Sequence, residues 1–119
     1  MEKPYFQTKI DELVGRELGS VVFVRDYVQF SFDGPCLTAL ILPVFTTASR
    51  AVFPGSTGWR DGLCSAIGIP VASVRFTDGE DLCIEFANSS CIVIPLREQD
   101  YIGPEAINYH ADDGTLVVF

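Results

Sequence analysis

The sequence has few of the residues that most often carry catalytic or metal chemistry. Its 119 residues include a single histidine, His110, and four cysteines, none of them in a CxxC pair. This scarcity disfavours a zinc site and a thioredoxin-like redox site, and we expect no cofactor and no metal ligands. We also expect no catalytic residues, because no nucleophile, base and orienting carboxylate form a recognisable set.

Basic residues are scarce as well, and they are unevenly distributed. Sixteen Asp and Glu residues outnumber eight Lys and Arg residues, which gives a net charge of −8. An acidic chain repels phosphate backbones and anionic lipids, so we expect neither a nucleic acid nor a membrane as a partner. The exception is the stretch from Gly34 to Arg60, which has no Asp or Glu and carries only the cations Arg50 and Arg60.

Long hydrophobic runs are also missing. No apolar run approaches the roughly 20 residues that span a bilayer, and the start MEKPYFQTKIDELVG has no signal-peptide core. We therefore expect a cytoplasmic protein whose four cysteines are free thiols. Hydrophobic residues nevertheless make up 48% of the chain, which suffices for a core and favours a homodimer that buries the excess apolar surface.

An internal repeat predicts the architecture. Residues 13–43 and 66–95 align with each other, with Gly15 opposite Gly68 at an offset of 53, and insertions at turns raise the offset to 55. Each copy reads as three short strands with alternating apolar residues, preceded by a short helical turn that ends at one of these glycines. The last segment, residues 106–119, reads as a C-terminal hairpin with DDG in its turn.

These elements predict a single, mainly β domain over residues 1–119. Two three-stranded antiparallel meanders, residues 20–43 and 73–95, are expected to pack as a sandwich or to close as a small barrel. The apolar positions that the two copies share are expected in the core. These positions are Val21, Phe23, Phe30, Phe32, Val74, Phe76, Ile84 and Phe86.

The two copies differ at positions that should point away from the core. The first copy has Val22 and Val24 where the second has Arg75 and Thr77. An outer face this apolar is expected to be covered, either by the C-terminal hairpin, by the middle loop or by a partner chain. The third alternative predicts a homodimer that buries Val22, Val24 or the run Leu40–Phe45.

The middle segment TTASRAVFPGSTGWRDG is the first candidate binding surface. It is rich in small residues and glycine, as loops are, yet it carries Arg50, Phe53 and the only tryptophan, Trp59. Aromatic residues and arginine in a long loop are typical of interface hot spots. The alternative is that Phe53 and Trp59 fold back to cap the core, and both interpretations can hold at once.

The segment DYIGPEAINYH, residues 100–110, and the acids that follow it form the second candidate surface. The acids match no calcium-loop spacing, which favours solvated turn carboxylates over a metal site. Both a binding surface and a turn that closes the fold remain open for this segment. Its candidate contact residues are Asp100, Tyr101, Glu105, His110, Asp112 and Asp113.

Local rules predict the shape of this segment. Glycine followed by proline breaks a strand, so we expect a turn at Gly103–Pro104 and a helical turn at Glu105–Ala106. The hairpin leaves His110 next to solvent. The rings of Tyr101 and Tyr109 are expected to pack on the core, because tyrosine combines a large apolar area with one polar tip.

Two features carry a resemblance to known sequences: the paired G-x-x-φ-x-S-V-x-F units and the segment DYIGPEA. From Leu13 to Ala106 the chain resembles small uncharacterised bacterial β-rich proteins with an L-[IV]-G-x-x-V segment, a D-G turn and an F-rich strand. Some relatives of that kind are regarded as immunity proteins of toxin systems. The resemblance implies a bacterial cytosolic protein and supplies no catalytic residue.

The leading functional hypothesis is a non-catalytic module that binds another protein. Its acidic shell suits a basic partner, as an immunity-type inhibitor of a nuclease-like toxin would require. The alternative is a β-barrel that binds a small apolar or cationic ligand, and an enzyme of unknown type ranks third. A large enclosed pocket would favour the ligand-binding barrel, whereas a solid core with an exposed aromatic patch would favour the protein-binding module.

Overall fold

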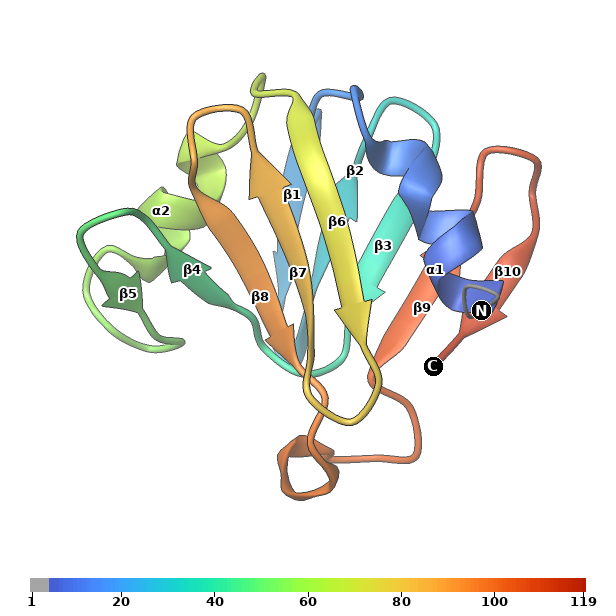
Figure 1. The fold of residues 1–119 in the computed structure, drawn as a ribbon. Helices are drawn as coiled ribbons and strands as arrows, with labels where there is room; N and C mark the ends of the chain where they lie inside the picture. Colours follow the sequence, from blue (N-terminus) through green and yellow to red (C-terminus); the bar gives the residue numbers. More distant parts are fainter. Residues whose placement is uncertain (1–4) are drawn as a thin grey trace.

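A computed structural model of the chain describes residues 5–119 as two five-stranded antiparallel sheets that face each other (Figure 1). The first four residues of the expected 1–119 domain lie outside this description. The first sheet has the strand order β1 (Ser20–Val24), β2 (Tyr27–Ser31), β3 (Cys36–Ala39), β9 (Ile107–His110) and β10 (Leu116–Val118). The second sheet has the order β5 (Ala51–Val52), β4 (Val44–Thr46), β8 (Cys91–Pro95), β7 (Asp81–Phe86) and β6 (Val71–Thr77). The helical elements are α1 (Tyr5–Ile10), η1 (Asp11–Leu13), α2 (Trp59–Ser65) and η2 (Glu98–Asp100).

Both predicted meanders are confirmed, as β1-β2-β3 in one sheet and β6-β7-β8 in the other. Alternation along each central strand turns every second side chain inward, because successive side chains of a strand point to opposite faces. All eight shared apolar positions contribute to the core. Phe30, Phe32, Ile84 and Phe86 are fully buried, and Val21, Phe23, Val74 and Phe76 are partly buried against them.

The fold is a sandwich, and the barrel alternative is wrong. The chain crosses between the sheets after each meander, so that β4 pairs with β8 and β9 pairs with β3. Each sheet therefore consists of one meander and the hairpin that follows the other meander. The predicted C-terminal hairpin is confirmed as β9-β10. This exchange extends each meander within its own sheet, and across residues 5–119 no strand ladder joins the two sheets into a closed cylinder.

The two copies meet around an approximate two-fold axis. The backbone N–H of Gly15 donates to the carbonyl of Val71 at 2.8 Å, and the N–H of Gly68 donates to the carbonyl of Leu18 at 2.7 Å. Both bonds connect residues that are equivalent at the offset of 53. The two glycines have φ angles of 89° and 87°, which side chains disfavour, so the glycine prediction at both helix ends is confirmed.

The short helices are exchanged in the same way. The α1 helix precedes the first meander but packs against β6 of the second, and α2 precedes the second meander but packs against β1 of the first. Figure 1 shows the two helices at opposite sides of the sandwich. Each helix contributes one buried aromatic ring at equivalent positions, Phe6 and Trp59. The repeat therefore extends beyond the aligned segments to the helices and the hairpins.

One local prediction in the segment after β8 is wrong. Glu105 and Ala106 form no helical turn, and the helical turn lies earlier, in η2. Arg97, the residue before η2, donates from its backbone N–H and its Nε–H to the carboxylate of Asp100, the last residue of η2. Ala106 instead belongs to the sheet, because its N–H donates to the carbonyl of Phe119 and its carbonyl accepts from Leu40. Gly103 and Pro104 lie in a bend, as expected.

Candidate functional site

A hollow of about 430 Å³ lies between the β1-β2 turn, the β3-β4 connection and α2. Its walls are apolar and aromatic, with Phe23, Leu42 and Trp59 among them, and two arginines, Arg25 and Arg60, stand at its rim. We call it the arginine hollow. It is lined by Phe23, Val24, Arg25, Val28, Leu42, Gly55, Ser56, Gly58, Trp59, Arg60 and Asp61.

Trp59 forms the wall of the arginine hollow rather than an exposed patch. Its side chain is 6% exposed, its ring packs edge-on against Phe23 at a centroid distance of 5.7 Å, and its Nε1–H donates to the carbonyl of Pro43 at 2.8 Å. Trp59 thus caps the core, while Phe53 of the same segment is 57% exposed. In the middle segment, Trp59 therefore caps the core, and Phe53 is the aromatic residue left exposed for a contact.

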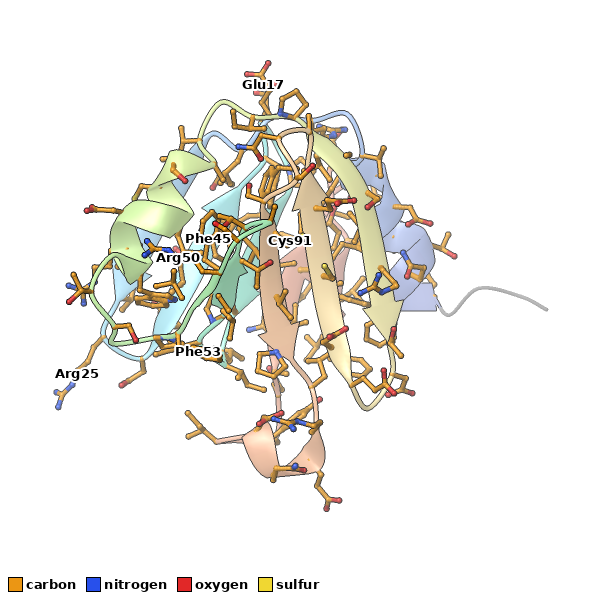
Figure 2. All side chains as sticks on the ribbon, turned by 60° about the vertical axis from the view of Figure 1, so that its left-hand side comes forward. Glu17, Arg25, Phe45, Arg50, Phe53 and Cys91 are labelled. Atoms are coloured by element: carbon orange, nitrogen blue, oxygen red, sulfur yellow. The ribbon has the colours of Figure 1, made fainter. Side chains whose placement is uncertain are left out.

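Three arginines gather at this end of the molecule. Arg25 and Arg60 line the hollow, and a guanidinium nitrogen of Arg50 lies 3.7 Å from the place a side chain would occupy at Gly58. Within residues 5–119 none of the three forms an ion pair. Figure 2 shows Arg25 projecting away from the β1-β2 turn and Arg50 lying beside α2. Asp61 is the one carboxylate that lines this hollow with Arg25 and Arg60.

A second hollow, of about 440 Å³, adjoins the first. The two share Arg25 and Leu42 in their walls, and the second adds the bend after η2, in which Ile102 is 85% exposed. Glu105 is the one predicted contact residue of the Asp100–Asp113 region that lines it. Two joined hollows with the exposed apolar side chains of Phe53 and Ile102 at this end form a surface of the kind that marks protein contacts.

The remaining residues of the Asp100–Asp113 region do not form one site. Asp100 bonds to Arg97 in η2, whereas the β9-β10 turn carries Asp112 and Asp113, which pair with Arg16 at 3.2 Å and Lys9 at 3.0 Å. The Arg97 guanidinium holds the pKa of Asp100 below its usual range. These carboxylates tie loops to the body of the fold.

Asp113 illustrates this structural role. The amide of Thr115 donates to its carboxylate at 2.9 Å, and the Lys9 ammonium of α1 lies on its other oxygen. These hydrogen bonds, with that of Thr115 the larger cause, hold the pKa of Asp113 well below its usual range. A carboxylate engaged by both its own turn and α1 is arranged to hold the hairpin in place.

The aromatic residues of this region pack on the core. Tyr109 is fully buried, and its hydroxyl donates a short hydrogen bond to a carboxylate oxygen of Glu12. Burial, together with the Glu12 carboxylate, raises the pKa of Tyr109. Tyr101 is partly buried against the core, and His110 is exposed, so all three placements agree with the predictions.

Neither thiol nor metal chemistry is developed in the part of the chain that the structure describes. Burial, with the adjacent Cys91 as the next cause, raises the pKa of Cys83 to about 11, so this thiol stays protonated at neutral pH and is a poor nucleophile. The four cysteines are free. Across residues 5–119, no three His, Cys, Asp or Glu side chains are grouped as a metal ion would require.

The outer face of the first sheet forms a second distinctive surface, which we call the neutral face. Its central row runs across all five strands and contains no charged residue. The register places Val22, Gln29, Thr38, Asn108 and Val118 side by side in that row. The outward positions of the second sheet, by contrast, include Arg75, Asp81 and Glu85.

Neither intramolecular cover proposed for Val22 and Val24 is present. Their side chains remain 45% and 38% exposed, because the C-terminal hairpin extends the same sheet at its opposite edge. Val24 also lines the arginine hollow beside the middle segment, which leaves it partly open. The run Leu40–Phe45 is largely buried inside the chain itself, with Ile41 and Phe45 at 6% and 4% exposure. The third alternative, a partner chain, stays a prediction.

Sequence reasoning found Arg50, Phe53 and Trp59 but missed Arg25, Arg60 and Ile102 as surface residues of this end. Arg25 lies outside the acid-free stretch, in the turn between two strands of the first copy. The repeat alignment makes Phe23, which lies two residues before Arg25, equivalent to Phe76. In the structure each of these two rings packs against an aromatic ring from a helix of the other copy. Only the exchange of helices reveals that this turn meets Trp59.

No family model, curated protein or solved structure matches the chain. None of the helices within residues 5–119 has the length and apolar character needed to cross a membrane.

Proposed function

We propose that this chain is a non-catalytic protein-binding module that contacts its partner with the end bearing the arginine hollow. The observation that carries the proposal is the set of three unpaired arginines, Arg25, Arg50 and Arg60, around an open aromatic hollow. Unpaired guanidiniums keep their fork of donors for an external acceptor, and arginine and aromatic rings dominate binding energy in protein interfaces.

The apolar surroundings of the arginines support a protein partner over a small ligand. Phe53 and Ile102 are exposed at this end, and the two hollows that share Arg25 and Leu42 spread along the surface rather than enter the core. The interior of the sandwich is filled by buried side chains, the largest of which include Tyr109 and Phe30. A broad, shallow surface of this kind suits a segment of another protein.

Affinity capture with matched variants tests the proposal. The tagged protein is used as bait in a lysate of its source organism beside the double variant Arg25→Glu/Arg60→Glu and the control Arg75→Glu, whose residue is exposed on the second sheet. We expect a protein that the wild type and the control retain and the double variant loses. Equal retention by all three, or no retention above the tag alone, contradicts the proposal.

A basic partner is the narrower form of the proposal. The net charge of −8 would steer a basic protein toward this chain, as inhibition of a nuclease-like toxin by an immunity-type protein requires. A bacterial, cytoplasmic setting belongs to this form and agrees with four cysteines that remain free thiols. Association rates that fall steeply with salt would support it, and rates insensitive to salt would contradict it.

We further propose a homodimer formed through the neutral face. Two chains of charge −8 repel each other wherever their carboxylates meet, so the face without charges is the favourable one for self-association. Light scattering at micromolar concentration should then give twice the chain mass of 13.1 kDa. Val22→Glu should give the monomer and the control Ser73→Glu, on the charged sheet, should not. A wild-type protein of 13.1 kDa would contradict the dimer.

A further inference from the structure

A pair of aromatic rings packs at each side of the sandwich, and the two pairs occupy equivalent positions of the repeat. We call the side with β1 the first half and the side with β6 the second half. In the second half the ring of Phe6 from α1 packs edge-on against Phe76 of β6, with centroids 5.0 Å apart. In the first half Trp59 from α2 packs edge-on against Phe23 of β1, with centroids 5.7 Å apart. The offset of 53 relates both members of one pair to the other, so the two sites are structural counterparts.

A third ring completes the site in the second half only. Phe119 lies 5.8 Å from Phe6 and 4.7 Å from Phe76, measured between ring centroids. Its backbone continues the β9-β10 ladder, since its N–H donates to the carbonyl of Ile107 and its own carbonyl accepts from Ala106 and Ile107. The ladder thereby holds the third ring on the aromatic pair.

The first half has a proline where the second half has Phe119. Val117 pairs with Tyr109 as Val52 pairs with Phe45, so counting two residues onward makes Pro54 the counterpart of Phe119. By the same count, Pro43 in the first half is the counterpart of Ile107 in the second half. Neither proline has an N–H for the ladder, which therefore ends earlier, and the chain turns away at Gly55 with a φ angle of 82°.

The arginine hollow is the place left open by this difference. It lies on Phe23 and Trp59, as Phe119 lies on Phe76 and Phe6, and its volume of about 430 Å³ exceeds what one side chain needs. The rims differ too. The counterpart of Arg60 is Gln7, which is engaged within the protein, because its Oε1 accepts from the amide of Phe76 and its Nε2 donates to Asp11.

Charge distinguishes the two rims further. Arg25 occupies the position of Asp78 in the second half. The guanidinium of Arg60 lies over the Phe23 ring, 5.6 Å from its centroid, and Asp61 is the only carboxylate among the lining residues. An open aromatic site with Arg25 and Arg60 at its rim attracts a ring that has negative charge close to it.

The geometry points to a specific occupant, on the assumption that the proposed protein-binding function holds. The arginine hollow takes a phenylalanine or tyrosine side chain from a segment of the partner, in the position that Phe119 occupies in the other half. Carboxylates that flank this residue in the partner segment bind the guanidiniums of Arg25, Arg60 and Arg50. The local segment is acidic whatever the net charge of the whole partner.

A peptide titration followed by tryptophan fluorescence tests this assignment. Trp59 is the only tryptophan and stands in the wall of the hollow, so its emission reports occupation of this site. The probe is a blocked five-residue peptide with one phenylalanine between two aspartates on each side. We expect saturable binding, weakened about tenfold or more when alanine replaces the phenylalanine or lysines replace the aspartates.

Matched variants locate the contact on the protein. Arg25→Glu/Arg60→Glu should weaken the peptide by about tenfold or more, whereas the exposed Arg75→Glu should leave its affinity unchanged. Unchanged far-ultraviolet circular dichroism and urea midpoints establish that the variants are folded. Equal affinity for the aspartate and lysine peptides, equal affinity of wild type and double variant, or no binding at millimolar peptide would each overturn the assignment.

N-acetylphenylalanine serves as the second probe, because it has a ring and a carboxylate but no peptide segment. Weaker binding than that of the peptide supports a protein segment as occupant, and equal binding overturns it in favour of a small aromatic acid. The outcome is separable from that of the proposed function. A partner captured through Arg25 and Arg60 in the absence of peptide binding would leave that function standing and refute only the aromatic, acidic occupant.

Discussion

The two halves of this sandwich share one aromatic framework but are completed in different ways. The second half is closed from within, by Phe119 on its aromatic pair and by ion pairs that hold the β9-β10 turn to Lys9 of α1 and to Arg16, which follows η1. The first half ends its hairpin at Pro54 and leaves both the hollow and three arginines open. One copy of a duplicated unit is thus closed by its own side chains, while the other leaves a hollow open at the surface.

The hairpin strands show the same contrast inside the core. Phe45 of β4 and Tyr109 of β9 are counterparts, since each pairs with the residue that follows the equivalent cysteine, Ile92 or Leu37. The hydroxyl of Tyr109 donates a hydrogen bond to the carboxylate of Glu12 in η1. Phe45 instead lies against the bare backbone of Gly62 in α2. A polar link in one half is replaced by close packing in the other.

The largest expected effect comes from deleting these two core rings. Tyr109→Ala and Phe45→Ala should each lower the free energy of unfolding by about 3–5 kcal/mol, because a large buried ring leaves a cavity. The loss should be greater at Tyr109, which also leaves Glu12 without its hydroxyl partner. Urea melts measure both, with the exposed Phe53→Ala as a control near zero. Similar losses for Phe53 and Phe45 would contradict the assigned core.

Removing the third ring should make the second half resemble the first. Phe119→Ala is expected to cost about 2–4 kcal/mol, since its ring packs on both Phe6 and Phe76. Val14→Ala, at a residue that is 49% exposed and lies outside the neutral face, is the control and should change stability by no more than about 0.5 kcal/mol. A loss at Phe119 as small as that of the control would mean that the ring does not close this side.

Filling the bare helix surface should harm the first half. In Gly62→Ala the new Cβ would lie 2.7 Å from a ring carbon of Phe45, and the overpacking should cost about 1–3 kcal/mol despite the better helix propensity of alanine. Adding Phe45→Leu should relieve the clash, so the double variant should lose less than the sum of the single variants. Additive losses in the urea melts would rule out the contact.

Acid should loosen the ion-paired turn of the second half first. The folded pKa of Asp113 is depressed, so its stabilising contribution is present above the unfolded value of about 3.9 and is lost as the pH falls through the folded value. Stability should therefore be flat near neutral pH and decline below about pH 4. Asp113→Asn should flatten this decline in pH-dependent urea melts. An unchanged profile would assign the acid sensitivity to other carboxylates.

The smallest expected effect lies at the only histidine. His110→Ala should change the stability of the isolated chain by no more than about 0.5 kcal/mol, because its side chain is exposed there on the neutral face opposite Cys36 and Leu116. Its counterpart in the first half is Thr46. Thermal and urea melts of the variant would check this. A larger loss would show that the neutral face is covered in solution and would favour the dimer.

Much of the fold was predictable because strands leave a period of two in the sequence. The alternation in VQFSF and LCIEF places Phe30 and Ile84 inside both sheets, and turn residues between the strands define the meanders. The repeat alignment did not include the two hairpins, β4-β5 and β9-β10. The offset rises from 55 at Cys36 and Cys91 to 64 at Phe45 and Tyr109, because the connection that carries η2 is longer.

The candidate site was predicted only in part, because its residues come together through contacts that a local sequence pattern does not show. The acid-free stretch and its aromatic residues pointed to Arg50, Phe53 and Trp59. The opposite interpretation, that Trp59 caps the core, depends on its bond to Pro43, and composition cannot reveal such a contact. The Asp100–Asp113 region seemed continuous in sequence, yet its acids separate in space because η2 and the β9-β10 turn hold different ones.

The sequence by itself determined the strands, the two meanders, their buried positions and the charge asymmetry, because these depend on local alternation, turn residues and composition. Tertiary structure alone decided that the sheets form a sandwich, that hairpins and helices are exchanged between the copies, and that Arg25 and Trp59 line the same hollow. It also decided which half is closed, since Phe119 reaches the Phe6–Phe76 pair and Pro54 leaves the counterpart open. These outcomes depend on contacts between residues distant in the chain, which no local pattern records.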